Sequence, residues 1–357
     1  MSKLFSTIKI RDLEIKNRLW VSPMCMYSCE NQDGVVGDWH LVHLGARAVG
    51  GAGLVMVEAT GINPEGRISP WCPGIWNQEQ VEAWSRITKF ISASGSVPAI
   101  QLAHAGRKGS TYRAWSGSGT VPLDQGGWET YSASAKAFEG YQAPRALDKS
   151  ELLQLVEDFR VAAANALEAG FEVIEIHAAH GYLLHQFLSP LSNERTDEYG
   201  GSLENRARLL LEVVRAVREA IVSKPLLVRF SATDYMPGGW DQEQTNQVAA
   251  WAYEAGADLF DISSGGLVAG AKIPTGPGYQ VPLSESVHQA SRAPTSAVGQ
   301  ITEATQAEAI LQSGEVEVVM MGRQLLRDPY FPLRAAHELG DEVSWAVQYE
   351  RGKWPSA

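Results

Sequence analysis

The sequence is poor in cysteine, in long apolar runs and in positive charge. Its three cysteines, Cys25, Cys29 and Cys72, form neither a Cys-x-x-C pair nor an even-numbered set, which argues against a disulfide framework and favours a reducing compartment. No apolar run is long enough to cross a bilayer, and residues 1–5 lack a signal-peptide core. The 30 Lys and Arg residues are outnumbered by 41 Asp and Glu residues, which argues against a polyanionic partner. These absences predict a cytoplasmic protein without a membrane or nucleic-acid partner.

What the chain does contain is a series of short apolar runs rich in β-branched residues. Most of them are continuously apolar, as is typical of parallel strands that are covered on both faces. The runs are Arg18–Met24, Gly53–Thr60, Val97–His104, Phe171–His177, Leu226–Ser231, Leu259–Ser263, Pro294–Gly299 and Val316–Gly322. Helical patterns lie between them, clearest at Lys149–Ala169, Ser202–Val222, Asp241–Glu254 and Thr302–Gln312. We expect N-caps at Asp148, Ser202, Asp241 and Thr302, and helix ends at Gly170, Gly256 and Gly314.

Eight strand–helix units predict an α/β fold in which one domain, residues 1–357, forms a (β/α)8 TIM barrel. A doubly wound sheet is the alternative, but it would more often have fewer strands and an early Gly-x-Gly-x-x-Gly turn. The glycine-rich run 50–53 precedes its strand, so it is not a dinucleotide fingerprint.

Two connections are much longer than ordinary strand-to-helix loops. Residues 105–147 follow the third predicted strand and are rich in glycine, serine and aromatic residues, and Gly181–Gly201 follows the fourth. In a barrel both lie at the C-terminal face, where such loops build the active site. We therefore expect a lid or small subdomain over the mouth.

Polar and small residues gather where the predicted strands end. An apolar strand that runs into two histidines and a tyrosine is costly unless those groups are paired or used. In strand order, the mouth would receive Ser22, Pro23, Met24, Cys25 and Tyr27, then Ala59 and Thr60, Gln101 and His104, His177, His180 and Tyr182, Arg229, Gly299, and finally Gly322 and Arg323.

Three familiar barrel chemistries fit this set poorly. A metal hydrolase could use His177 and His180, but it needs further ligands, and Arg229 would repel the metal. No metal is therefore expected. A Schiff-base aldolase needs a lysine at a strand end, and no predicted strand ends in one. A phosphate-sugar isomerase usually has a carboxylate base, whereas Glu58 and Glu175 lie inside strands.

A flavin site fits better on physical grounds. A fixed cation such as Arg229 favours a reduced flavin, whose negative charge lies near N1 and the C2 carbonyl. Gln101 can both donate to and accept from the pyrimidine edge. Gly299 and Gly322 would let backbone amides approach a phosphate, with Arg323 supplying charge. Neutral histidines can polarise a carbonyl, and a tyrosine can donate a proton.

Four stretches stand out as motifs: Ser22–Tyr27, Gln101–Arg107, His177–Leu183 followed by Ser192–Ser202, and Met321–Arg323. In this order and spacing the chain resembles the old yellow enzyme family of FMN-dependent ene-reductases, specifically the bacterial thermophilic-like branch that includes xenobiotic reductases. The resemblance extends from Phe5 to Trp354.

The resemblance implies a role for each motif residue. FMN would be contacted by Ser22, Pro23, Met24, Cys25, Ala59, Gln101 and Arg229, and its phosphate held by Gly299, Gly322, Arg323 and Arg327. His177 and His180 would bind the substrate oxygen, Tyr182 would donate a proton, Tyr27 would be a further donor to the substrate, and Cys25 would tune the flavin potential. Val298 stands where a related reductase type carries tryptophan, so the pocket could differ in shape there.

The C-terminal tail, residues 341–357, also resembles that of the branch. The resemblance implies that Arg351 reaches the site of a neighbouring subunit in a homodimer or homotetramer. The implied activity is ping-pong reduction of the C=C bond of α,β-unsaturated carbonyls, maleimides or nitro compounds, with NADPH or NADH as reductant. A non-redox barrel enzyme acting on a phosphate ligand, or a binding protein, is the alternative.

Overall fold

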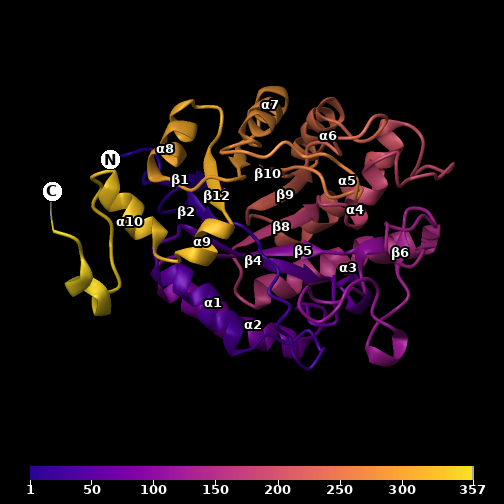
Figure 1. The fold of residues 1–357 in the computed structure, drawn as a ribbon, viewed down its shortest axis with the longest axis horizontal. Coiled ribbons are helices and arrows are strands. Elements are labelled where there is room, and N and C mark those ends of the chain that lie inside the picture. The colour runs from indigo at the N-terminus through magenta and orange to yellow at the C-terminus, as the bar shows by residue number, and fades with distance from the viewer. Residues whose placement is uncertain (356–357) are drawn as a thin grey trace.

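A closed barrel of eight parallel strands forms the centre of the computed structural model, which describes residues 1–355 (Figure 1). Each predicted run overlaps one barrel strand, so the predicted TIM barrel is confirmed. Around the barrel the strands are β3 (Leu19–Val21), β4 (Leu54–Gly61), β5 (Val97–Ala103), β8 (Val173–Ala178), β9 (Leu226–Ser231), β10 (Leu259–Ser263), β11 (Thr295–Ala297) and β12 (Val318–Met321).

Helices follow the strands and cover the outside of the barrel (Figure 1). The larger ones are α1 (Asp38–Val49), α2 (Gln78–Ala93), α3 (Lys149–Glu168), α5 (Leu203–Ile221), α6 (Gln242–Glu254), α7 (Val281–Ser291), α8 (Ala304–Gln312) and α10 (Phe331–Glu338). Short helices α4 (Leu183–Leu188) and α9 (Arg323–Arg327) lie at the carboxyl ends of β8 and β12.

Three of the four expected N-caps are present, because Asp148, Ser202 and Asp241 each accept a backbone N–H at the start of their helix. The expectation for Thr302 was wrong: α8 begins at Ala304, and Glu303 is its N-cap. The side chain of Gln306 reaches back instead and accepts the Thr302 N–H at 3.1 Å. Gln306 thus binds the backbone that leads into the helix, and no side chain among residues 1–355 caps the first turn of α8.

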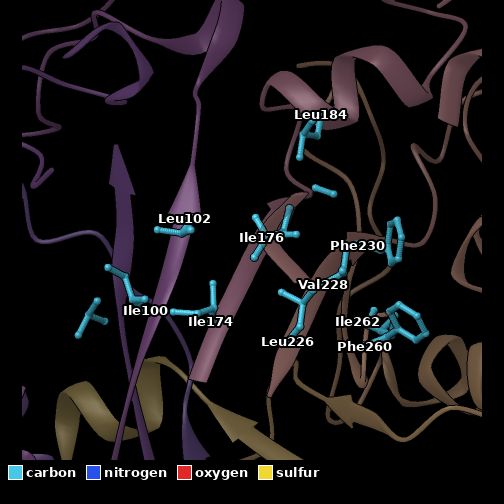
Figure 2. Close-up of a cluster of buried hydrophobic side chains, with 14 of the residues drawn as sticks. Ile100, Leu102, Ile174, Ile176, Leu184, Leu226, Val228, Phe230, Phe260 and Ile262 are labelled. Atoms are coloured by element: carbon cyan, nitrogen blue, oxygen red, sulfur yellow. The ribbon is translucent and has the colours of Figure 1, made fainter. Parts of the chain in front are cut away.

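Side chains of each strand alternate between the outside and the inside of the barrel. Those that point outward pack in one cluster with residues of the helices. Figure 2 draws five of them on their strands, namely Ile100, Leu102, Ile174, Ile176 and Val228. Those that point inward fill the barrel. Near the amino-terminal ends of the strands, the inward residues form an apolar cluster with the hairpin of β1 (Ile8–Ile10) and β2 (Leu13–Ile15). The hairpin therefore closes the lower end of the barrel.

The two long connections are present at the opposite, C-terminal face. The first contains η2 (Gly106–Lys108), η3 (Leu123–Gln125) and a small sheet of β6 (Tyr131–Ser132) and β7 (Arg145–Ala146). The second carries α4. No helix among residues 1–355 is long and apolar enough to cross a membrane.

Candidate active site

The floor of the barrel mouth is a layer of buried polar side chains from four adjacent strands. The Gln101 side chain donates to Glu175 Oε1 at 2.8 Å. Arg229 Nε lies 2.8 Å from Asp261 Oδ2, with the N–H off the line between the atoms, so the contact is an ion pair more than an aligned hydrogen bond. A second guanidinium nitrogen of Arg229 donates to Ser22 Oγ at 3.3 Å. The layer thus holds two carboxyl groups and one cation.

Glu175 is the least satisfied member of this floor. Its side chain is fully buried, and its second oxygen, Oε2, has no hydrogen-bond partner among the described residues. Burial and, second, the neighbouring Asp261 carboxylate raise the pKa of Glu175 to about 8. Glu175 therefore holds its proton to a higher pH than an exposed glutamate, and the contact with Arg229 is made by Asp261.

A cavity of about 510 Å³ opens beside the floor. Its lining includes five of the predicted cofactor residues, namely Arg229, Gly299, Gly322, Arg323 and Arg327. Gly299 has a φ of +122°, a conformation that side chains other than glycine rarely adopt. The combination of two glycines and three guanidinium groups suits an anionic ligand of the size of a mononucleotide.

A cluster of neutral donors lies at the end of β8. The rings of His177 and His180 are 5.2 Å apart, and those of His177 and Tyr182 are 5.0 Å apart, each pair close to perpendicular. Burial, followed by the positive charge of Arg229, lowers the pKa of both histidines well below the ordinary value. Burial also raises the pKa of Tyr182 well above the ordinary value. All three groups are therefore uncharged near neutral pH.

A backbone hydrogen bond decides which ring nitrogen of His177 carries the proton. His177 Nδ1 accepts the Ala179 N–H at 3.2 Å, so its proton is on Nε2, which can donate to a ligand. His180 Nε2 lies 2.8 Å from the hydroxyl of Ser263, which also lines the cavity. Ser263 therefore connects the histidine pair to the cavity.

The loop after β3 contributes the other predicted polar groups. Cys25, Tyr27 and Tyr182 pack against one small buried cluster that includes Ala59. Burial raises the pKa of Cys25 to about 12, so this thiol is un-ionised. Tyr27 has a φ of +52°, and its ring meets that of Trp115 from the lid at 6.0 Å. The first and fourth strand ends thus converge on one spot, as predicted.

Other predicted residues lie at or beyond the edge of this group. Met24 lies next to Gly322, and Pro23 precedes it in the same loop. Arg327 is exposed and bonded to Gln324. Arg351 lies in η4 (Val347–Gly352), exposed beside α10, and contacts none of the other predicted site residues within the described chain.

Sequence reasoning missed Asp261, Ser263 and Lys108. The first two lie at the end of the sixth predicted strand, so the strand-end rule applied to Leu259–Ser263 would have found them. Lys108 lies in the loop after the third predicted strand, where the strand-end rule does not reach. Its ammonium group is largely buried beside Tyr182, with Nζ 5.2 Å from the ring centroid.

Comparison with known proteins agrees with this geometry. The profile of the NADH:flavin oxidoreductase / NADH oxidase family matches residues 3–342. An NADPH dehydrogenase of Bacillus subtilis (strain 168) is 46% identical over 98% of this chain and 99% of its own. An old yellow enzyme homologue from Zymomonas mobilis has a TM-score of 0.79 and 29% identity, covering 98% of each chain. A 2-naphthoyl-CoA reductase in complex with 2-naphthoyl-CoA has a TM-score of 0.86 at 27% identity, over 94% of this chain and 52% of its own.

Fold and site together define a barrel oxidoreductase that uses a flavin. The chain belongs to the NADH:flavin oxidoreductase / NADH oxidase family, and it is an NADPH dehydrogenase of the old yellow enzyme type. Its cofactor is FMN, with NADPH or NADH as reductant. The residues present fit FMN, because the cavity is lined by the buried cation of Arg229 and by Arg323, which suits an anionic group. The amide of Gln101 lies in the polar floor beside this cavity.

Proposed function

We propose that this enzyme reduces activated C=C bonds of α,β-unsaturated carbonyls, maleimides or nitro compounds. FMN, when bound, supplies the hydride that it has taken from NADPH. The observation that supports this substrate class is the cluster of His177, His180 and Tyr182, which are neutral hydrogen-bond donors beside a cavity that fits the cofactor.

In this proposal each of the chain's own groups has one task. His177 Nε2–H and the His180 ring bind the oxygen of the activating group and withdraw charge from the double bond, which is worth on the order of a few kcal/mol per donor. Tyr182 gives its hydroxyl proton to Cα, and Tyr27 adds a further hydrogen bond to the substrate. Cys25 remains a thiol and tunes the cofactor from beside it.

The cofactor residues divide into two groups. We propose that Ser22, Pro23, Met24, Ala59, Gln101 and Arg229 surround the ring system of FMN and that Gly299, Gly322, Arg323 and Arg327 bind its phosphate. Arg229 is suited to the ring because its charge is buried and paired with Asp261, whereas Arg323 and Arg327 line the same cavity with exposed side chains.

The test is an anaerobic absorption titration of the purified protein. A yellow protein that bleaches with NADPH and recovers its spectrum with cyclohexenone would establish both halves of the cycle. A protein that bleaches with NADPH but does not respond to an enone, a maleimide or a nitroalkene would refute the substrate class and leave the NADPH dehydrogenase activity.

Replacing His177 with alanine should weaken phenol binding, and an unchanged phenol affinity would refute the role of His177 in binding the substrate oxygen.

We further propose that the active enzyme is a homodimer, or a tetramer of such dimers, in which Arg351 completes the site of the neighbouring subunit. Two features support this arrangement. The tail exposes Val347, Tyr349 and Trp354 to solvent in the isolated chain, and Arg351 lies away from the mouth of its own barrel. Sedimentation of the FMN-loaded protein tests the oligomeric state.

A further inference from the structure

Lys108 joins three of the loops that form the barrel mouth. It belongs to η2, directly after β5, and its Nζ donates to the carbonyl oxygen of His180 after β8 at 2.8 Å. The same Nζ donates to the carbonyl oxygen of Gly266 after β10 at 2.7 Å. One ammonium group therefore holds together segments that are far apart in sequence.

The turn that Lys108 holds has an unusual backbone. His180 has a φ of +57°, and Gly181 a φ of +73°. A side chain at Gly181 would meet the carbonyl oxygen of Gly266 at 2.3 Å, so the two loops are in close contact at this point. The His180 N–H donates to Ser231 Oγ at 2.9 Å, and the Gly181 N–H donates to His185 Nδ1 at 2.9 Å. Lys108 completes this set by binding the His180 carbonyl, and it thereby orients both His180 and Tyr182.

The charge of Lys108 has no partner of opposite sign. Among the described residues, no carboxylate forms an ion pair with it. Its Nζ lies instead 4.7 Å from the ring centroid of Phe138 and 5.2 Å from that of Tyr182. Burial lowers the pKa of Lys108 to about 8. A largely buried cation without a counter-ion is costly, and such groups are found where a negative charge is bound or develops.

We propose that Lys108 is a positioning residue that fixes the His180–Tyr182 turn and gives the neighbouring oxygen site a preference for anionic oxygen over neutral carbonyl ligands. The inference rests on the proposed function, since it assumes that His177 and His180 bind a ligand oxygen. In this proposal the preference for a negatively charged ligand comes from Lys108 and not from His177 or His180, which donate hydrogen bonds to the ligand.

The experiment compares two ligands on the oxidised, FMN-loaded enzyme, with binding followed by the flavin spectrum. Pentafluorophenol is ionised at neutral pH, and cyclohexenone is neutral. Lys108→Met should weaken binding of the phenolate by about tenfold or more and binding of cyclohexenone by about two- to threefold. Loss of the contact that fixes the turn affects both ligands, whereas only the phenolate also loses the attraction of the charge. Lys108→Arg should retain most of the phenolate affinity. Lys136→Met is the matched control, since this lid lysine pairs with Glu194 at the surface and should change neither affinity.

Equal weakening of both ligands in Lys108→Met would overturn the charge preference and leave a purely structural role, as would failure of Lys108→Arg to retain the phenolate. Unchanged affinities would overturn the whole inference. Lys108→Gln, which keeps a donor but no charge, provides the same comparison if the methionine variant does not fold. Wild-type protein that binds phenolate but does not reduce cyclohexenone would refute the proposed function alone, because the binding comparison needs no turnover.

Discussion

The barrel interior has two halves that differ sharply in chemistry although they come from the same strands. Strands β5, β8, β9 and β10 each place one residue inward in the lower half and another two positions later in the upper half. The lower residues are Ala99, Val173, Leu227 and Leu259, and the upper residues are Gln101, Glu175, Arg229 and Asp261. All eight side chains are buried, so burial alone does not distinguish the halves.

This difference shows that one half of the barrel interior contributes to the stability of the fold and the other half to the functional site. The lower half gains free energy from removal of apolar surface from water. The upper half contains two carboxyl groups and one guanidinium group, and one of the carboxyl oxygens has no hydrogen-bond partner within residues 1–355. All of these groups are costly to bury. We infer that the upper half is retained for its ligand, and variants in the two halves should therefore fail in different ways.

The largest effect is expected where a single hydroxyl above the polar floor is removed. Tyr182→Phe should slow the oxidative half-reaction with cyclohexenone by on the order of 10²–10⁴-fold, because the proton donor is lost. Reduction by NADPH should change little, and so should the free energy of unfolding. Stopped-flow spectroscopy separates the two half-reactions. Equal slowing of both would exclude Tyr182 as the proton donor.

Leu227→Ala tests the lower half. Truncating this fully buried side chain should reduce the free energy of unfolding by about 2–5 kcal/mol, as measured by urea denaturation. Phenolate affinity of the folded, FMN-loaded variant should stay within about twofold of wild type. Leu153→Ala is the matched control, since Leu153 lies exposed on α3 and should change stability by less than about 0.5 kcal/mol. A large loss of phenolate affinity in Leu227→Ala would show that the halves are not independent.

Glu175→Gln tests how much the buried carboxyl group of the polar floor reduces stability, and the test is the pH dependence of unfolding. The folded-state pKa of about 8 is above the ordinary value of 4.5, so the folded protein binds more protons than the unfolded chain between these values. Stability of the wild type should therefore fall as pH rises through this window, by on the order of a few kcal/mol relative to Glu175→Gln. Below pH 4.5 the difference in unfolding free energy between wild type and Glu175→Gln should be constant. Urea unfolding at several pH values measures it, with the exposed Glu139→Gln as control. A pH-independent difference would mean that Glu175 is ionised in the folded protein.

The smallest effect is expected at the tail, outside both halves. Arg351→Ala should raise the KM for cyclohexenone by about three- to tenfold. If Arg351 serves the neighbouring subunit, co-expression of Arg351→Ala with Tyr182→Phe should yield mixed dimers in which one site has both residues. Enone reduction above that of either variant alone would show the shared site, and its absence in purified mixed dimers would exclude it.

The strands could be predicted because their burial on both faces leaves continuous apolar runs, as at Leu226–Ser231. The ends of those strands also predicted much of the site, since barrel geometry brings together residues such as His177 and Arg229. The β1–β2 hairpin was not predicted, because its three-residue strands carry too little pattern. The role of Lys108 depends on carbonyl oxygens of His180 and Gly266, and no side-chain pattern encodes where a backbone oxygen points.

The hairpin that closes the lower end has a consequence for the order of events in catalysis. Ile8, Ile10 and Ile15 pack against the side chains that fill the lower half of the barrel, so within the described chain no passage leads through it and ligands reach the site only from the mouth. The nicotinamide nucleotide and the compound to be reduced must therefore bind and dissociate through the same opening. We therefore expect each to obstruct the other at high concentration, which steady-state rates would reveal as mutual substrate inhibition.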